Sequence, residues 1–245
     1  MKKILRRLKL VFDNPKRTIK HFVFKLYIMF DRTYKNTWKI VDQTPGWLSK
    51  YEGYLLFYLA RKCSPLRTIV EIGSYEGRST IALASGAHEG LIIHAIDPHT
   101  GDKTEVEAGL KINTYESFLK NTKNFNNIHA IRKFSVDATQ DVSDKAIQLL
   151  FIDGWHSEKA VNDDIQSFLP LLFSSCTIVF DDWTNEEVST GIRKNLIFLP
   201  PVVGVVGKDL IFSNDTSVVK SFLAKVIKRT TPSSVLYTYS SDPIK

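Results

Sequence analysis

Residues 149–165 have the sequence LLFIDGWHSEKAVNDDI, in which an apolar run ends at a carboxylate. The run predicts a buried strand that stops at Asp153, where Gly154 turns the chain. His156 then begins a segment with the apolar spacing of an amphipathic helix. A carboxylate and an imidazole three residues apart at a strand end indicate chemistry rather than packing. The simpler alternative is a plain turn, with His156 as a surface residue that caps the helix.

Strand-like and helix-like segments alternate on both sides of this stretch. We expect strands at about 68–73, 91–97, 128–133, 148–153 and 177–181. We expect helices at about 77–86, 104–122, 139–146, 157–171 and 216–229. This alternation predicts an α/β fold with a Rossmann-like, doubly wound, mostly parallel sheet of seven strands. Residues 200–214 predict an antiparallel hairpin at its end, with a tight turn at Gly207-Lys208.

The positive charge of the chain is concentrated at its beginning. The 245 residues have a formal net charge of +7, but residues 1–40 alone carry a net charge of +10 and the remainder −3. We therefore divide the chain into a basic amphipathic helical arm (1–44), one domain (45–229) and a polar tail (230–245). Such an arm suits an anionic membrane surface, or its apolar stripe packs on the domain or on a second subunit as a homo-oligomer. A nucleic-acid partner is not expected, since the body does not continue the basic patch.

The remaining composition points to the cytoplasm. The two cysteines, Cys63 and Cys176, are too few and too far apart for a disulfide framework or a zinc site. No secretory pattern follows the basic start, and the apolar stretch 22–30 contains Lys25 and is too short to cross a bilayer. We expect a cytoplasmic protein, with the arm as a means of peripheral contact with the inner membrane surface.

The first two predicted strands end in residues that suit an adenosine-type cofactor. Glu71 and Gly73 end the first strand, and Asp97 ends the second. A carboxylate at Asp97 can accept two hydrogen bonds from a ribose diol. A dinucleotide site requires G-x-G-x-x-G, whereas this turn has G-x-x-x-G and an acid that repels a pyrophosphate. The turn therefore favours S-adenosylmethionine, which carries an amino group and a sulfonium centre, over NAD.

Four ordered motifs carry a family resemblance. They are IVEIGSYEGRST (69–80), IIHAIDPHTG (92–101), FIDGWHSEKAVNDDI (151–165) and TIVFDDW (177–183). Together they resemble a class I S-adenosylmethionine-dependent methyltransferase, and most closely the bacterial metal-dependent O-methyltransferases that modify sugars and glycans. PGWLSKYEGYLLFYLA (45–60) is similar to the amino-terminal helix of those enzymes. The chain departs from the family at Tyr75, which replaces the middle glycine of the usual turn.

The resemblance implies a role for each residue that matches a family motif. The expected contacts of the cofactor are Glu71, Gly73, Ser74, Tyr75 and Ser79 at its methionine end, Asp97 at its ribose, Ser135 and Asp137 beside its adenine, and Asp153. The expected ligands of Mg²⁺ or Mn²⁺ are Asp153, Asp181 and Asp182. His156 is the expected general base, with Asp153 as its catalytic partner.

Physical chemistry independently favours a metal and a base at this place. Methyl transfer to an alcohol requires an alkoxide-like oxygen, yet a hydroxyl, like water, loses its proton only near about pH 15. A divalent cation lowers that pKa, and a neutral imidazole takes the proton. The adjacent residues Asp181 and Asp182 can both face a metal only where the strand ends and the backbone turns. By contrast, we expect Asp163 and Asp164 on a solvated helix face.

The sequence therefore predicts O-methylation of a sugar or glycan hydroxyl, on a cell-surface or lipid-linked molecule. Two alternatives from other classes stay open at this point. One is a protein that binds the cofactor without catalysis and supports a partner enzyme. The other is an NAD-linked oxidoreductase, which Gly73, Gly77 and Asp97 favour and Glu71 opposes. Tryptophans at 47, 155 and 183 are candidates for the walls around a sugar ring, or else for the core.

Overall fold

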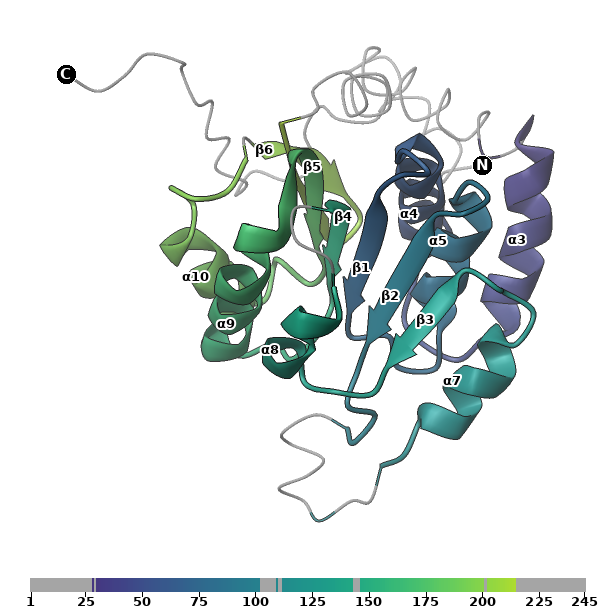
Figure 1. Ribbon diagram of the computed structural model, residues 1–245, viewed down its shortest axis with the longest axis horizontal. Helices are drawn as coiled ribbons and strands as arrows, with labels where there is room; N and C mark the ends of the chain where they lie inside the picture. Colours follow the sequence, from purple (N-terminus) through teal and green to yellow (C-terminus); the bar gives the residue numbers. More distant parts are fainter. Residues whose placement is uncertain are drawn as a thin grey trace, which may run out of the picture.

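One seven-stranded sheet runs through the computed structural model, which describes residues 28, 30–101, 109, 112–142, 146–200 and 202–214 (Figure 1). The strands are β1 (Thr68–Ile72), β2 (Ile92–Ile96), β3 (Ile128–Ile131), β4 (Ile147–Ile152), β5 (Leu172–Phe180), β6 (Val202–Val206) and β7 (Asp209–Ser213). Their order is β3-β2-β1-β4-β5-β7-β6. Strands β1 to β5 are parallel, and β7 is antiparallel to both β5 and β6. The predicted mostly parallel sheet with a terminal hairpin is confirmed.

Helices cover both faces of the sheet (Figure 1). On one side lie α3 (Arg32–Gln43), α4 (Lys50–Lys62), α5 (Arg78–Gly86) and α7 (Tyr115–Thr122). On the other lie α8 (Ser135–Ala138), α9 (Glu158–Phe168) and α10 (Glu186–Lys194). Short 3-10 turns at Thr139–Asp141 and Leu169–Leu171 complete the helical segments of the described residues. None of the described helices combines the length and the apolar character that a membrane span requires.

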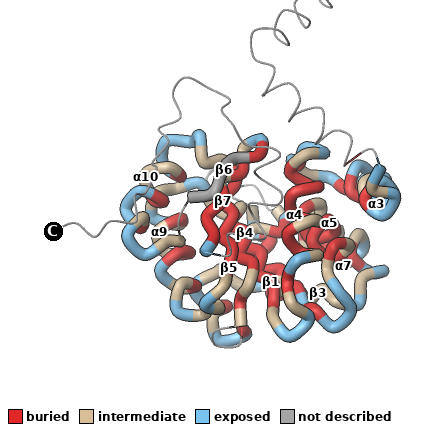
Figure 2. The backbone as a smooth tube through the Cα atoms, turned by 90° about the horizontal axis from the view of Figure 1, so that it is seen from above, coloured by how far each residue is buried: buried red, intermediate tan, exposed pale blue. Residues whose placement is uncertain are grey.

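The strand β4 shows why the sheet carries two cores. Its alternate residues Leu149 and Phe151 pack in the core beneath α4 and α5, whereas Leu150 and Ile152 pack in the core beneath α9 and α10. Successive strand residues point to opposite faces, so an unbroken apolar run marks a strand that is buried on both sides. Figure 2 shows the central strands as a buried layer between the half-exposed helices.

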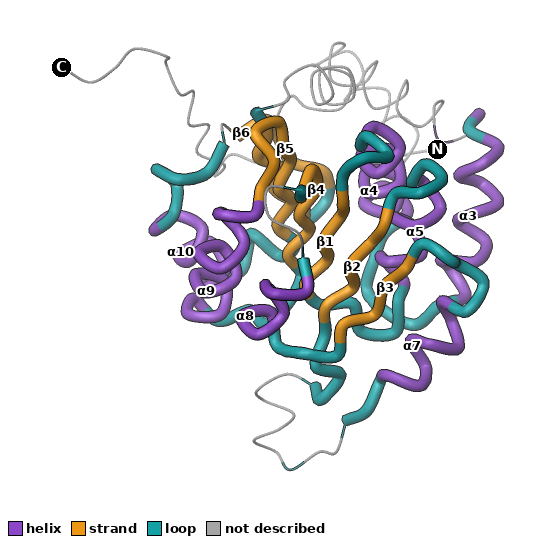
Figure 3. Tube along the Cα trace, viewed as in Figure 1, coloured by secondary structure: helices purple, strands orange, loops and turns teal. Residues whose placement is uncertain are grey.

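The carboxyl ends of four strands meet at one edge of the sheet, from which the connecting loops emerge (Figure 3). Backbone hydrogen bonds fix this alignment just beyond the strands. The amide of Gly73 donates to the carbonyl of Ile96 at 2.9 Å, and the amide of Asp153 donates to that of Ile72 at 2.8 Å. The amide of Asp181 donates in turn to Ile152 at 3.0 Å. The residues that follow β1, β2, β4 and β5 are therefore brought together.

The first helix of the domain, α4, begins where its capping residues predict. The amide of Glu52 donates to Oγ of Ser49 at 3.3 Å, and the amide of Ser49 donates back to Oε2 of Glu52 at 2.8 Å. This reciprocal capping box satisfies two amides that a helix start otherwise leaves unpaired. Before it, α3 packs on the domain through Tyr34, which is fully buried and donates its hydroxyl proton to the carbonyl of Lys50 at 2.6 Å.

Several predicted boundaries differ from the structure. Strand β5 begins at Leu172, five residues before its predicted start, because a 3-10 turn containing Pro170 ends the preceding helix. The predicted helix 139–146 is wrong in the described residues, where a short helix and a 3-10 turn end at Asp141 and β4 begins at Ile147. Of the predicted helix 104–122, the described residues 112–114 are not helical and α7 spans Tyr115–Thr122. Nearly all of the arm before residue 30, as well as the predicted helix 216–229 and the tail 230–245, lies outside the described residues.

Helix α10 is a feature that the sequence prediction missed. Asn185 caps it by accepting a hydrogen bond from the amide of Glu187 at 3.0 Å. Its first turn is acidic, with Glu186 and Glu187, and its last turn is basic, with Arg193 and Lys194. This distribution of charge complements the helix dipole and is a recognisable signal in the sequence.

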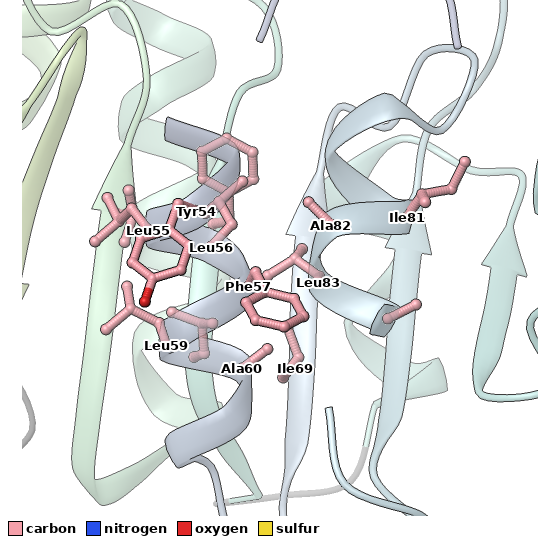
Figure 4. Packing of buried hydrophobic residues seen from close by; sticks show 14 of the residues in the cluster. Tyr54, Leu55, Leu56, Phe57, Leu59, Ala60, Ile69, Ile81, Ala82 and Leu83 are labelled. Carbon is pink, nitrogen blue, oxygen red and sulfur yellow. The ribbon is translucent and has the colours of Figure 1, made fainter. Parts of the chain in front are cut away.

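Helices α4 and α5 cross in close contact, with Phe57 and Leu83 side by side in Figure 4. A methyl group on Gly86 would lie 2.0 Å from the carbonyl oxygen of Phe57. Alanine is preferred over glycine in a helix by about 1 kcal/mol, but overpacking against backbone costs about 1–3 kcal/mol. We expect Gly86→Ala to lower the free energy of unfolding, measured by urea denaturation.

The neighbouring substitution Ser85→Ala serves as a control on the same helix. It adds no atom at the crossing, so its effect should stay within about 0.5 kcal/mol. A Gly86→Ala protein as stable as the parent would show that the helices are free to move apart.

Candidate active site

A cavity of about 640 Å³ opens at the carboxyl edge of the sheet. The predicted site residues that line it are Gly73, Ser74, Tyr75, Ser79, Asp97, Ser135, Asp153, His156, Asp181 and Asp182. Two predicted residues do not line it. Glu71 lies fully buried beneath the cavity floor, and Asp137 is exposed on α8. The residues at the four strand ends thus share one space, as their positions in the sequence predict.

The turn after β1 is held in shape by the carboxylate of Asp97. Its Oδ2 accepts hydrogen bonds from the amides of Ser74 at 3.0 Å and Tyr75 at 2.7 Å, and its Oδ1 accepts one from His99 at 2.6 Å. Tyr75 adopts a positive φ of 45°, a conformation that normally favours glycine. The two hydrogen bonds to Asp97 explain how the turn forms although its middle glycine is absent. Oδ2 already accepts two hydrogen bonds, whereas Oδ1 keeps a lone pair for a further donor.

Gly73 is required by the close approach of β1 and β4. Its φ is +86°, and a Cβ atom at this position would lie 2.0 Å from the carbonyl oxygen of Asp153. Any other residue would therefore push the two strand ends apart. The turn after β1 and the loop after β4, which begins at Asp153, are thus adjacent because residue 73 has no side chain.

Glu71 is a buried carboxyl group at the base of the site. Burial raises the pKa of Glu71 from 4.5 to about 8, a shift that the nearby hydroxyl groups of Ser79 and Thr80 oppose and that Asp153 and Asp97 reinforce. Oε2 accepts from the hydroxyl of Thr80 at 2.5 Å, while Oε1 is buried without a partner among the described residues. The position is therefore suited to a cation or a hydrogen-bond donor that arrives from the cavity.

The raised pKa of Glu71 makes a prediction about stability. The folded protein binds the proton more tightly than the unfolded chain, so ionisation of Glu71 lowers the free energy of unfolding as pH rises from about 4.5 to about 8. We expect Glu71→Gln to reduce the fall in melting temperature between pH 5 and pH 8 in the absence of ligands. The exposed residue Glu89 provides the control, since Glu89→Gln should leave that fall unchanged. An unaltered pH dependence in Glu71→Gln would show that Glu71 is already ionised in the folded protein.

Asp164 belongs to the cavity wall, contrary to the prediction of a solvated position. It is 3% exposed, lines the cavity and accepts a hydrogen bond from the hydroxyl of Ser135. Burial raises the pKa of Asp164 to about 6, against the effect of the Ser135 hydrogen bond. The buried face of α9 consists of Val161, Asp164, Ile165 and Phe168, with the spacing of one helix face. The signal was present in the sequence, because Asp164 lies within that apolar stripe.

The residues that follow β4 and β5 form an acidic lip at the edge of the cavity, which consists of Asp153, His156, Asp181 and Asp182. Two of its carboxylates lie near its imidazole. Nε2 of His156 lies 3.9 Å from Oδ1 of Asp153 and 3.6 Å from Oδ2 of Asp182. The nearby carboxyl group of Asp153 raises the pKa of His156, although partial burial opposes it. Burial raises the pKa of Asp153 to about 7, while His156 acts in the opposite direction. The backbone turn predicted after β5 is present, since Asp182 has a φ of 47°.

Asp181 faces a residue that sequence analysis did not single out, Lys208 in the turn between β6 and β7. Nζ of Lys208 lies 3.3 Å from Oδ2 of Asp181 and 2.8 Å from Oδ1 of Asp182, and Lys208 lines the cavity. Partial burial lowers the pKa of Lys208, but the contacts with Asp182 and Asp181 outweigh it and raise that pKa above its ordinary value. The other carboxylate oxygen of Asp181 accepts from the amide of Asp182 at 2.7 Å.

The donor set at the lip fits a divalent cation. One ligand atom each from Asp153, His156 and Asp182 lie within 4.8 Å of one another, and carboxylate with imidazole suits several divalent metals. Asp181, the third predicted ligand, lies beside Lys208 in this arrangement instead of joining that group. The three-aspartate ligand set stays a prediction.

The comparisons with known proteins agree with this architecture. Residues 70–183 match the model of a family described as a methyltransferase domain. "Uncharacterized protein y4gI" of Sinorhizobium fredii is 25% identical over 155 residues, which cover 62% of this chain and 16% of that protein. The chain thus spans about a sixth of the length of this curated relative.

Two solved structures share the fold. The O-methyltransferase TomG from Streptomyces achromogenes, involved in tomaymycin synthesis and solved in complex with SAM, superposes with a TM-score of 0.54 at 16% identity, covering 78% of this chain and 95% of that one. An O-methyltransferase from Bacillus cereus in complex with SAH gives a TM-score of 0.54 at 17% identity, covering 81% of this chain and 97% of that one.

Proposed function

We propose that this chain is a class I S-adenosylmethionine-dependent methyltransferase, which methylates a hydroxyl oxygen of a sugar or glycan with the help of a divalent cation. The match of residues 70–183 to the model of a methyltransferase domain supports the proposal. A single observation carries the proposal: the turn after β1 and the lip after β4 and β5 open into the same cavity. A cofactor bound by the first would present its methyl group to an acceptor bound at the second. Bringing acceptor oxygen, methyl carbon and sulfur into line is itself a large part of catalysis.

The proposed cofactor pose follows from charge and hydrogen-bonding capacity. The buried Oε1 of Glu71, which is without a partner among the described residues, would accept from the amino group of the methionine moiety. Asp97, at the end of β2, has a lone pair left on Oδ1 that would accept from a ribose hydroxyl. Ser135, with Asp164 behind it, would lie beside the adenine. Once ionised, Glu71 would repel the pyrophosphate of NAD, which argues against the oxidoreductase alternative.

The cavity also has the size and the walls for a carbohydrate acceptor. Its volume of about 640 Å³ lies in the usual range for small-molecule sites, about 300–1,000 Å³. Four aromatic residues line it, namely Trp47, Tyr75, Phe134 and Trp155. Trp47 is 77% exposed, and its ring centroid lies 5.5 Å from that of Tyr75. Flat apolar faces beside carboxylates suit a sugar ring, which has C–H faces and a hydroxyl edge.

In the proposed reaction the acceptor oxygen forms a bond to the methyl carbon, and the bond from that carbon to sulfur breaks. The electron pair of the broken bond stays on sulfur, which becomes a neutral thioether. His156, whose side chain is 44% exposed and lines the cavity, takes the proton of the acceptor hydroxyl at Nε2. When bound, a divalent cation held by Asp153 and Asp182 supplies the positive charge that lowers the pKa of that hydroxyl.

We expect His156→Ala to lower turnover by about 10²–10⁴-fold, because a positioned general base contributes roughly this factor. Affinity for S-adenosylhomocysteine should change little, since His156 lies at the acceptor side of the cavity. Turnover is measured as the initial rate of S-adenosylhomocysteine release with a panel of sugars and glycans. Affinity for S-adenosylhomocysteine is measured by calorimetry. His88→Ala, in the loop after α5, is the matched control. Unchanged turnover would remove His156 from the mechanism, and loss of Mn²⁺ binding would assign it to the metal ligands instead.

Chelation tests the cation separately. We expect EDTA to abolish methyl transfer and added Mg²⁺ or Mn²⁺ to restore it, with the melting-temperature increase caused by S-adenosylmethionine retained in EDTA. Retention is expected because Glu71 and Asp97, and not the lip, hold the cofactor. Full activity after exhaustive chelation would show that the lip acts without a metal.

A further inference from the structure

The turn between β6 and β7 brings a lysine into the acidic lip. Lys208 is the second residue of that turn, and its Nζ contacts Asp181 at 3.3 Å and Asp182 at 2.8 Å. These two residues are separated from Lys208 by more than twenty positions in the sequence and by the whole of α10 and β6. The contact therefore depends on the hairpin and not on neighbouring residues in the chain.

The backbone of this turn is fixed by a residue of α4. The amide of Lys208 donates to Oε1 of Glu52 at 2.8 Å, and Glu52 is held by its capping box with Ser49. Gly207 has a φ of +59°, and a Cβ there would lie 2.0 Å from the same Oε1. Glu52 is 3% exposed, so the side chain of Lys208 extends from a backbone that a buried residue holds in place.

The surroundings of Lys208 carry an excess of carboxyl groups. Strand register pairs Phe180 with Leu210, which places Asp181 next to Asp209 across the β5–β7 ladder. Asp209 is fully buried, and neither of its carboxyl oxygens has a hydrogen-bond partner among the described residues. Lys208 supplies the nearby positive charge for the carboxylates of Asp181 and Asp182, and this charge offsets their mutual repulsion.

We infer that Lys208 is a built-in cation of the lip, which holds Asp181 and Asp182 in place before a metal binds and competes with a divalent cation for them. The inference rests on the proposed metal-assisted function, because that function brings the cation to Asp182. Lys208 is a positioning residue in this account and not a group that reacts. The charge of Lys208 raises the Kd of the lip for a divalent cation, because the cation must share the carboxylate oxygens with the ammonium group or displace it.

The variant Lys208→Met tests this competition in the full-length protein. It keeps a long side chain but removes the charge. We expect its Kd for Mn²⁺, measured by calorimetry in the presence of S-adenosylhomocysteine, to fall at least tenfold. In EDTA its melting temperature should drop below that of the parent, and Mn²⁺ should restore it. Lys208→Arg, which keeps the charge, should resemble the parent on both measurements.

The matched control is Lys133→Met, which removes an ion pair with Asp141 away from the lip. It should leave the Kd for Mn²⁺ unchanged. Affinity for S-adenosylhomocysteine and the circular dichroism spectrum report whether each variant is folded.

A Kd for Mn²⁺ that is unchanged or weaker in Lys208→Met overturns the inference, and so does a lack of Mn²⁺ binding by both proteins. Should Lys208→Met fail to fold, Lys208→Gln provides the same measurement with a polar side chain. Failure of the proposed function is a separate result, since it would appear as absent or chelator-insensitive methyl transfer by the parent protein.

Discussion

The contact between the backbones of Gly73 and Asp153 is the constraint on which the site depends. With no side chain at residue 73, the end of β1 lies against the end of β4, and a Cβ atom would come 2.0 Å from the carbonyl oxygen of Asp153. This contact joins two loops with different chemistry, one built around Asp97 and the other around the carboxylates and imidazole of the lip. The parallel sheet places both loops at the same edge, and the absence of a side chain at Gly73 lets the two loops come into contact.

Much of the fold could be predicted because it is encoded locally. Unbroken apolar runs such as Leu149–Ile152 identify strands that are buried on both faces, and the Ser49–Glu52 pair identifies a helix start. The failures lie where local signals compete. The polar residues 139–146 resemble a helix face, yet the described residues 139–141 form only a 3-10 turn, and β4 begins at Ile147. Residues 172–176 extend β5 although serines interrupt their apolar pattern.

The candidate site also contains residues that the sequence predicts and residues that it does not. Residues that immediately follow a strand, such as Asp97 and Asp153, could be assigned to one edge from the chain order alone. The burial of Asp164 can be inferred from its place in the apolar stripe of α9, although its charge alone favours a solvated position. Lys208 could not have been found by such reasoning. Its contact with Asp181 depends on how far the hairpin reaches across the sheet edge, which spacing along the chain does not reveal.

The carboxylate of Glu52 accepts hydrogen bonds from two parts of the domain that are distant in sequence. One oxygen caps the first helix of the domain, and the other receives the amide of Lys208, 156 residues further along. Contacts of such long range form late in folding, because the intervening chain must be ordered first. The lip is therefore completed only after nearly the whole domain has been synthesised and the hairpin has docked. The same hairpin contributes Val206 and Ile211 to the core beneath α4 and α5, so both that core and the acidic lip are complete only once the hairpin has docked.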